Sequence, residues 1–531
     1  MGAIEASTFF AIFFLFIIFI QVNGFFLYNE HYAVLKTEYS DLHLTLFTYL
    51  FERSAAMPLR KKIGLLLGPA LFALLFFLPS LTGLESEPRA VLAVTVWVAS
   101  WWITEAIPIP ATSLLPIFLL PITGGADEET ATMAYADPIV FMYMGGFTIA
   151  LAIEKWNLHK RIAMTIISFV GTGGQRIVLG VILATALLSM WISNAATALM
   201  MLPIALALIK EVKDKDFFDE VSLNRFAKGL LLSVAYAASI GGLATLIGSV
   251  PNAAFAAVAS SNLDRTVTFA EWFLFGFPLT VILLTGLYFY LTKIQFRVTA
   301  QKDISTDFAR NQLKELGPMS YEEKSVLTIF TIVGFLWITS GFIPEAYRLS
   351  DTSISIIGAT SMFLLPAKQE RGGLMVWQDM KELPWGLLLL FGGGLSLAAA
   401  FESSNLTGWF GELLGGLEVL PFVLILIVLA AIVLFMTEIM SNTAVSNMLM
   451  PISIGLALGI GVDPYAIMGI VALTASCAFM LPISTPPNAA VFSSDYLTID
   501  DMVKAGFWMN IVAIFVIVAF VYFWQPVVLN Y

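Results

Sequence analysis

The chain has 531 residues, of which 59% are hydrophobic and only 12% are charged, and its formal net charge is −11. Soluble globular proteins carry roughly 25% charged residues, so a water-facing surface over most of this chain is excluded and lipid must be its main solvent. The sequence shows no basic clusters of the kind that bind nucleic acid, so nucleic acid is not favoured as a partner. The single cysteine, Cys477, excludes an internal disulfide and a multi-cysteine metal site.

The first 56 residues differ from the rest of the chain. Residues 8–22 are almost wholly apolar, but no basic residue precedes them, and residues 29–56 are polar and mixed. The stretch from Met57 to Lys62 has the basic character of a cytoplasmic start. We therefore expect residues 1–56 to be an N-terminal extension, either an extra span or an upstream addition.

Apolar stretches long enough to enter a bilayer recur from residue 63 to residue 525. They comprise residues 63–81, 89–107, 108–121, 138–153, 178–209, 228–259, 270–295, 324–345, 351–366, 384–402, 420–460, 463–494 and 505–525. Several exceed the roughly 20 residues of one span and contain Gly, Pro, Ser or Asn in mid-run. Such stretches predict helical hairpins and broken helices.

The distribution of Lys and Arg between the loops predicts the orientation of these segments. Basic residues gather at 60–62, 155–161, 210–228, 293–324 and 368–381, whereas the loops 122–137 and 403–419 have none. This pattern is satisfied when residues 178–209 enter from the cytoplasm and return to it, and residues 420–460 do the same from the other side. The sequence thus predicts an all-α polytopic membrane protein with two re-entrant hairpins, two broken helices and about 11 transmembrane helices.

The two halves of the chain repeat a local pattern. Ser193-Asn194-Ala195 lies 248 residues before Ser441-Asn442-Thr443, and a proline follows each serine by ten residues. Further downstream, Pro-Asn-Ala-Ala occurs at 251–254 and again at 487–490. We expect a first inverted repeat at 57–295, a cytoplasmic linker at 296–323 and a second repeat at 324–531. Inverted repeats are typical of secondary transporters, whose sites form near the midplane from discontinuous helices.

The predicted hairpin tips and helix breaks hold groups that suit small ions. Hydroxyls, amides and freed backbone carbonyls are hard oxygen donors, which suit Na⁺, and helix N-termini hold anions. No Lys or Arg lies within 177–209, 229–264 or 420–494, so the charge of an anion would be met by helix dipoles, hydroxyls and bound cations. Glu438, three residues before Ser441, is either a proton site or a group that holds the hairpin, and we favour the second role.

Three motifs resemble the divalent anion:sodium symporter family, including the INDY-type dicarboxylate carriers of bacteria. They are residues 102–108 (Trp-Ile-Thr-Glu-Ala-Ile-Pro), the paired Ser-Asn tips, and residues 476–491. The resemblance runs from about residue 57 to the end of the chain. It implies a homodimer that carries divalent anions together with Na⁺ by an elevator mechanism. It also implies location in a cell membrane, specifically a bacterial inner membrane.

The resemblance also implies site residues. The first sodium site would comprise Ser189, Ser193, Asn194 and Gly242. The second would comprise Thr437, Ser441, Asn442 and the backbone carbonyl of Ser484. The substrate carboxylates, for example those of succinate, malate or fumarate, would meet Ser193, Asn194, Ser441, Asn442, Thr443, Thr485 and Pro486.

One position departs from the family pattern, in which both tips read Ser-Asn-Thr. Ala195 stands at the threonine position of the first tip and removes one hydroxyl, which affects either substrate preference or affinity. The alternatives within the same fold are a sodium-independent dicarboxylate or tricarboxylate exchanger and a sulfate, citrate or tartrate carrier. An enzyme is disfavoured because the apolar stretches contain no histidine and no acid pair at metal-ligand spacing.

Overall fold

The computed structural model describes residues 58–79, 83–171, 173–215, 217–263, 265–298 and 307–529. The expected extension 1–56 and part of the expected linker 296–323 lie outside these residues. Within them the protein is helical, with one isolated β-bridge between Pro366 and Gly373 and no strand.

The contacts divide the chain into two units, and the first consists of residues up to 134 together with 399–406. Its helices are α4 (Leu59–Phe77), α5 (Ser86–Thr104), α6 (Ile109–Thr112), α7 (Leu115–Thr123) and α8 (Glu128–Met133). Helices α4 and α5 pack closely, because a Cβ at Gly68 would lie 2.7 Å from the rings of both Trp97 and Trp101.

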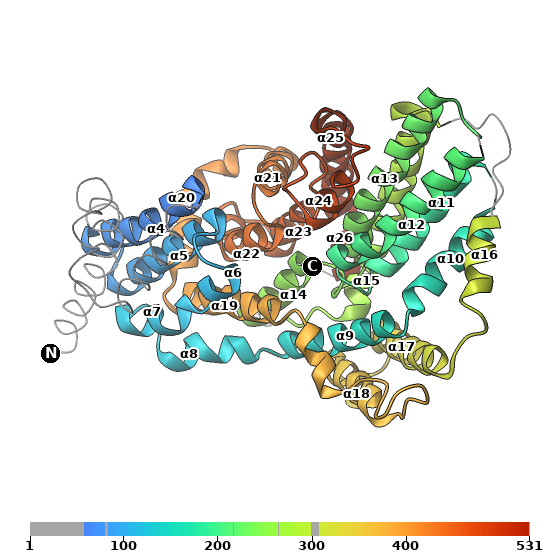
Figure 1. Cartoon of the computed structure of the whole chain (residues 1–531). Coiled ribbons are helices and arrows are strands. Elements are labelled where there is room, and N and C mark those ends of the chain that lie inside the picture. Colours follow the sequence, from blue (N-terminus) through green and yellow to red (C-terminus); the bar gives the residue numbers. More distant parts are fainter. Residues whose placement is uncertain are drawn as a thin grey trace, which may run out of the picture. The chain divides into compact units, whose positions relative to one another are not determined.

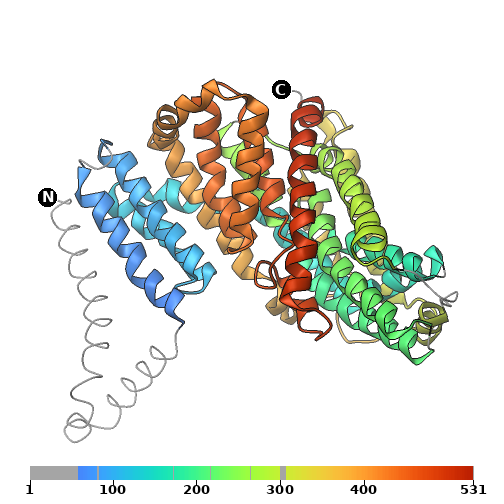
Figure 2. The same cartoon turned by 90° about the horizontal axis from the view of Figure 1, so that it is seen from above.

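The second unit consists of residues 135–398 and 407–531. Beyond α8 the helices follow in chain order (Figures 1 and 2): α9 (Pro138–Lys155), α10 (Leu158–Val170), α11 (Gly174–Ser189), α12 (Asn194–Asp214), α13 (Glu220–Gly241), α14 (Val250–Asn262), α15 (Phe269–Phe289), α16 (Asp307–Glu315), α17 (Tyr321–Ser340), α18 (Asp351–Leu364), α19 (Trp385–Ser403), α20 (Leu406–Leu414), α21 (Phe422–Thr437), α22 (Asn442–Gly459), α23 (Pro464–Ala475), α24 (Pro486–Phe492), α25 (Ile499–Phe523) and α26 (Gln525–Leu529).

The helices break where the sequence contains its Ser-Asn and Pro-Asn motifs. A turn separates α11 from α12, and another separates α21 from α22. A 3-10 turn, Gly242–Ala244, and a second turn at 246–248 separate α13 from α14, which has Pro251 in its first turn. Similarly, α24 begins with Pro486 after the irregular residues 476–485. Proline is well tolerated there because the first helical N–H groups have no partner within the helix.

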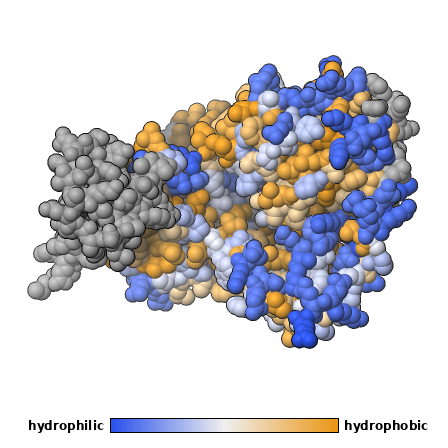
Figure 3. Space-filling model, in the orientation of Figure 1, coloured by the Kyte–Doolittle hydropathy of each residue, from blue (hydrophilic) through white to orange (hydrophobic). Residues whose placement is uncertain are grey.

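The length and composition of the helices confirm the predicted all-α polytopic membrane fold. Seven described helical segments are long and apolar enough to cross a membrane: 128–155, 194–214, 220–244, 269–295, 321–340, 385–403 and 499–529. Four described apolar helices are shorter, at 109–123, 174–189, 422–437 and 464–475, and the last three belong to the broken segments. In Figure 3, hydrophobic residues gather towards the middle of the face drawn, and hydrophilic residues gather at its right-hand and lower parts. The count of about 11 crossings and their orientation stay predictions.

The order of elements repeats along the chain. Helices α9 to α15 form a long helix, a short helix, a hairpin, a broken helix and a long helix, and α19 to α25 form the same series. The corner before each short helix is made by an asparagine in the left-handed conformation, Asn157 and Asn405, both at φ 55°. Asparagine tolerates this conformation better than most residues. These two residues are 248 positions apart, which is the spacing of the Ser-Asn motifs.

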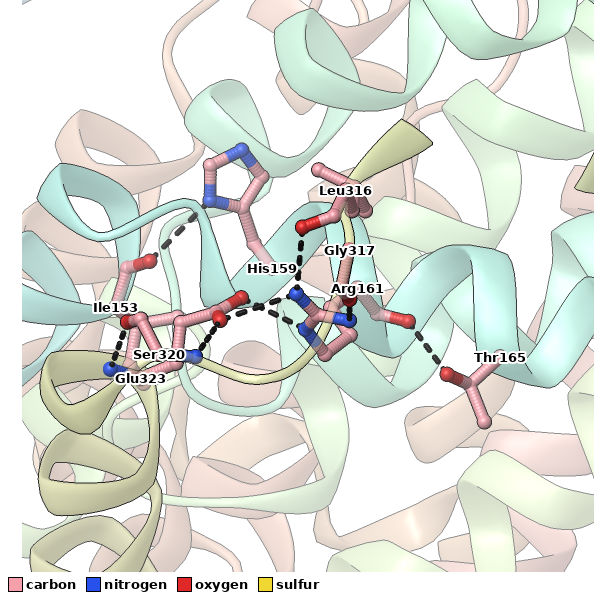
Figure 4. Close-up of polar contacts among 8 residues, drawn as sticks. All are labelled: Ile153, His159, Arg161, Thr165, Leu316, Gly317, Ser320 and Glu323. Carbon is pink, nitrogen blue, oxygen red and sulfur yellow. Dashed lines mark hydrogen bonds and ion pairs between the residues drawn. The ribbon is translucent and has the colours of Figure 1, made fainter. Parts of the chain in front are cut away.

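A buried ion pair fixes the short helix α10 to the start of α17 (Figure 4). Arg161 Nε lies 2.7 Å from Glu323 Oε1, and Arg161 Nη2 lies 3.1 Å from Oε2. The same guanidinium donates to the carbonyl oxygens of Leu316 and Gly317 at 3.3 and 3.0 Å. Glu323 also completes a capping box with Ser320. The carboxylate of Glu323 and the carbonyls of Leu316 and Gly317 therefore converge on one arginine, which holds α17 against α10.

Candidate functional site

The tip of the first hairpin brings four oxygen atoms together. Ser189 Oγ lies 2.6 Å from Asn194 Oδ1 and 2.7 Å from the carbonyl oxygen of Ala238. The same amide atom of Asn194 lies 3.0 Å from the Ala238 oxygen and 3.2 Å from that of Gly248. The hydroxyl has one proton and can donate to only one neighbour. The remaining oxygen contacts are therefore unfavourable unless a cation lies among them or the amide turns over.

The two orientations of the Asn194 amide suit two states of this cluster. With the nitrogen inward, the amide donates to Ser189 Oγ, to Ala238 and to Gly248, and no cation is needed. With the oxygen inward, the cluster presents only oxygen atoms, which is the donor set that Na⁺ prefers. The residues present therefore fit a sodium ion.

The break in the first broken helix is held by Asn252. Its Nδ2 donates to the carbonyl oxygens of Gly242 at 2.9 Å and Thr245 at 2.8 Å. A Cβ on Gly242 would lie 2.5 Å from Asn194 Oδ1 and 2.9 Å from the Gly248 oxygen. Glycine at 242 therefore lets the break approach the hairpin tip, while its own carbonyl is occupied by Asn252.

The tip of the second hairpin repeats the geometry of the first. Thr437 Oγ1 lies 2.6 Å from Asn442 Oδ1 and 2.9 Å from the carbonyl oxygen of Ala475. Thr437 is fully buried, and its single proton again serves two acceptors. A second cluster of hydroxyl, amide and carbonyl oxygens therefore occurs at the corresponding place in the second repeat.

The second break repeats the first at the level of single hydrogen bonds. Asn488 Nδ2 donates to the carbonyl oxygens of Ala478 and Leu481, both at 3.1 Å, and these acceptors precede it by ten and seven residues, as Gly242 and Thr245 precede Asn252. It also donates to Ser484 Oγ at 3.0 Å. By this spacing Ala478 corresponds to Gly242, and Ser484 corresponds to Gly248. Within the described residues, the buried Oδ1 atoms of Asn252 and Asn488 have no hydrogen-bond partner.

Glu438 ties the second hairpin to the second break. Its carboxylate accepts the backbone N–H groups of Phe479, Met480 and Leu481 at 2.8, 2.9 and 3.0 Å, and the Asn510 amide at 2.7 Å. All four partners are donors, which a carboxylate anion satisfies. The side chain is buried. This geometry supports the structural role that the sequence favoured for Glu438.

The two repeats interlock at this place. Helix α12 of the first hairpin packs against α24 of the second break, and α22 of the second hairpin packs against α14 of the first break. Ser249 Oγ lies 2.7 Å from Ser476 Oγ, which joins the two breaks directly. The four interrupted segments therefore meet in one region of the second unit.

The four helices that begin in this region each have a hydroxyl residue at the N-cap. These residues are Ser193, Ser249, Ser441 and Thr485. The side chains of Ser193 and Thr485 accept the N–H groups of their own helices, whereas Ser249 and Ser441 make no such bond. Free N–H groups and hydroxyls at helix starts are donors for an anion. Positive charge comes only from the helix dipoles here, because no Lys or Arg occurs in these segments.

The remaining predicted residues lie at the same helix starts. Thr443 is buried in the first turn of α22, and Pro486 is exposed at the start of α24. Ala195, partly exposed, takes the place in α12 that Thr443 takes in α22. The first helix start thus lacks the hydroxyl that the second has.

Sequence reasoning missed several groups that the structure brings to the clusters: the carbonyls of Ala238, Gly248 and Ala475, the hydroxyl of Ser249, and the amides of Asn252 and Asn488. Backbone carbonyls leave no mark in a sequence. The two asparagines were visible as matching Pro-Asn-Ala-Ala motifs, but the bonds that they make across the breaks were not.

Comparison with known families gives one match over nearly the whole chain. The family model described as the sodium:sulfate symporter transmembrane region matches residues 59–530. This agrees with a polytopic membrane protein.

Relatives of known function are similar over most of their length. The sodium-dependent dicarboxylate transporter SdcS of Staphylococcus saprophyticus is 42% identical over 481 residues, which cover 88% of this chain and 92% of the relative. The SdcS protein of Staphylococcus aureus strain NCTC 8325 is 40% identical over 514 residues, covering 95% of this chain and 98% of the relative. An alignment covering 95% of the chain extends into residues 1–56, which the motifs alone placed outside the resemblance.

Two solved structures share the fold at low sequence identity. They are MtrF of Neisseria gonorrhoeae, with a TM-score of 0.51, 12% identity and coverage of 76% of this chain and 84% of that chain, and YdaH of Alcanivorax borkumensis, with a TM-score of 0.51, 14% identity and coverage of 82% and 98%. Both resemble this chain in overall fold only.

Proposed function

Because the chain belongs to the sodium:sulfate symporter family, that is, the divalent anion:sodium symporters, we propose that it couples the entry of a divalent anion to Na⁺ across the cell membrane. The names of its similar relatives give dicarboxylates as their substrate class. We take C4 dicarboxylates such as succinate, malate and fumarate as the substrates. No enzymatic activity is proposed.

The observation that carries the proposal is the pair of matching oxygen clusters. In each, one hydroxyl lies at hydrogen-bond distance from an asparagine amide and a backbone carbonyl, and when the amide oxygen faces inward the hydroxyl has one proton for two acceptors. A sodium ion at each cluster would resolve this conflict. The first ion would be held by Ser189, Asn194 and the carbonyls of Ala238 and Gly248, with Ser193 and Gly242 adjacent.

The second ion would be held by the corresponding groups of the second repeat. Thr437, Asn442 and the carbonyl of Ala475 are in contact, and Ser484 takes the place that Gly248 has in the first repeat. Ser441 begins the helix beside them. Glu438 is a positioning residue here, since it fixes the N–H groups of the break without meeting either ion's oxygen cluster.

The anion would lie between the two ions, at the starts of the four helices. Its carboxylates would accept from the N–H and hydroxyl groups at Ser193, Asn194, Ser441, Asn442, Thr443 and Thr485, beside Pro486. Each sodium ion lowers the electrostatic cost of bringing a dianion into a site without Lys or Arg. We therefore expect Na⁺ to bind before the anion.

The transport cycle is proposed to be of the elevator type, in a homodimer, because the interrupted segments of both repeats meet in one compact region that can move as a body. Alternating access of this kind would carry the anion and both ions together.

Uptake of labelled succinate into proteoliposomes tests the function. An inward gradient of Na⁺ should drive uptake, and gradients of K⁺ or choline should not. The variants Asn194→Ala and Asn442→Ala should each abolish uptake at normal expression, and uptake near the wild-type rate in both would refute the site. Exchange in preloaded vesicles without a sodium gradient would instead indicate an exchanger.

Sulfate is a second candidate substrate, because Ala195 removes one hydroxyl from the first helix start and the family model is described by sulfate. Competition of unlabelled sulfate, citrate, tartrate and succinate against the labelled anion ranks these candidates. Stronger competition by sulfate than by succinate would replace the dicarboxylate assignment.

A further inference from the structure

A cavity of about 410 Å³ lies in the second unit, outside the oxygen clusters described above. Its walls are the N-terminal ends of α9, α15 and α18 together with α14. The charged residues that line it are Asp137, Arg348 and Asp351. A cavity of this size readily admits a four-carbon dicarboxylate with some of its water.

The distribution of basic residues predicts that this cavity lies on the non-cytoplasmic side of the membrane. Helix α9 runs away from the cavity to Lys155, and α15 runs away from it towards Lys293. Helix α18 leads away from it to the loop that contains Lys368 and Arg371. Basic loops mark the cytoplasmic side, so the opposite ends of all three helices, which form the cavity, face the outside.

The floor of the cavity is close to the first oxygen cluster. Met142 and Leu246 line the cavity. The hydroxyl of the buried Tyr143 bonds to the carbonyl oxygen of Leu246 and lies 3.1 Å from that of Ser249. Gly248, whose carbonyl faces Asn194, lies between these two residues in the chain. The cavity therefore borders the turn that carries the Gly248 carbonyl of the proposed sodium site, and Tyr143 holds this turn.

The three charged groups of the cavity are engaged to different extents. Asp137 caps α9 by accepting the N–H of Ile139 at 2.8 Å. Asp351 accepts the N–H of Phe269 at 2.7 Å and the hydroxyl of Ser340 at 3.3 Å. Arg348, which is half-buried, makes no hydrogen bond or ion pair with any described residue, although Asp351 is near enough to act on it electrostatically. Its guanidinium is thus the cationic donor in the lining of the cavity, and it is available to a ligand.

We propose that this cavity is the outer entry vestibule, in which Arg348 binds one carboxylate of the incoming dianion before the anion reaches the helix starts. A guanidinium binds a carboxylate through two parallel hydrogen bonds, and the site itself contains no such group. The inference rests on the proposed function for its substrate and adds a binding residue on one side of the membrane.

Kinetics in intact cells test the role of Arg348. Arg348→Gln should raise the KM for external succinate about tenfold, since a hydrogen bond to a charged group is lost, and should leave kcat near the wild-type value. Arg348→Lys should retain most of the affinity because it keeps the charge. Arg371→Gln, a matched loss of one arginine from the basic loop beyond α18, should leave the KM unchanged. A KM within twofold of wild type for Arg348→Gln would overturn the proposal.

A labelling experiment tests the vestibule without relying on the transport rate. The cavity contains the exposed residue Ser260, and the chain's own Cys477 is buried. In the full chain with Ser260→Cys, a membrane-impermeant maleimide should label intact cells, succinate should slow the labelling at least threefold, and Arg348→Gln should remove that protection. Lack of labelling, or labelling that succinate does not slow, would refute the vestibule even where sodium-driven uptake is normal. Protection by sulfate but not by succinate, without succinate uptake, would refute the dicarboxylate assignment instead.

Discussion

Substituting Gly242 by alanine should specifically weaken sodium binding. The new Cβ would lie 2.5 Å from Asn194 Oδ1 and 2.9 Å from the Gly248 oxygen, whereas ordinary contacts begin near 3.4 Å. Asn194 would have to retreat by nearly an ångström, and functional groups must be held within about 0.5 Å of their working geometry. Overpacking of this kind costs about 1–3 kcal/mol, which corresponds to a rise in the sodium concentration for half-maximal uptake of roughly 5- to 150-fold.

The matched control for this variant is Gly229→Ala in α13, the helix that precedes the turn containing Gly242. A Cβ at Gly229 has its nearest neighbours at 3.5 Å or more, on Phe296 and Val298, and alanine is the better helix former by about 1 kcal/mol. The control should therefore keep the wild-type dependence on sodium. The assay is succinate uptake as a function of Na⁺, together with the rise in Tm that Na⁺ produces in the purified protein. A Gly242→Ala variant with a normal Tm response and a normal sodium dependence would refute the assignment of the first cluster.

Three further predictions concern neighbouring groups. Ser189→Ala and Thr437→Val each remove a hydroxyl from one cluster. Each should raise the Na⁺ concentration for half-maximal uptake about tenfold. If neither variant changes this concentration, cation binding at the two clusters is refuted. Glu438→Gln keeps the shape of the side chain but turns an amide N–H towards backbone donors. The free energy of unfolding should therefore fall by about 3 kcal/mol, which would be measured as a lower Tm both with and without Na⁺. A change in Tm only in the presence of Na⁺ would show instead that Glu438 acts on the ion. Ala195→Thr restores the hydroxyl at the start of α12 and should lower the KM for succinate relative to that for sulfate by about fivefold. If competition assays give the same ratio of these two KM values as the wild type, Ala195 does not determine specificity.

The places where helices break could be predicted from the sequence, because they depend on local chemistry. Pro487 and Pro251 cannot continue a preceding helix, and the hairpin serines are good N-caps. The repeat was visible for the same reason, since Asn194 and Asn442 each follow a serine, and a proline lies ten residues after each serine. The helix breaks of the structure, at 190–193, 242–249, 438–441 and 476–485, fall inside the four long apolar stretches that these signals singled out.

The partners of those residues could not be predicted, because they are backbone carbonyls brought together by tertiary packing. Gly242 was expected at the first sodium site, but the sequence could not show that its carbonyl accepts from Asn252 or that the carbonyl of Gly248 faces Asn194. Ala238 and Ala475 carry no side-chain signal at all. The bond between Ser249 and Ser476 joins residues 227 positions apart, which no local pattern encodes.

The four donors around Glu438, which suit a carboxylate anion, have a consequence for the response of the carrier to voltage. The proposed moving region holds this one buried carboxylate and, in the segments 177–209, 229–264 and 420–494, no basic residue to balance it. Moving one elementary charge through 100 mV changes the free energy by about 2.3 kcal/mol. Two sodium ions and a dianion add no charge, so the loaded and empty forms would cross the membrane with equal charge and a complete cycle would carry no electrical current. A third sodium ion would make each cycle move one positive charge inward, so a current recorded during succinate uptake counts the ions directly.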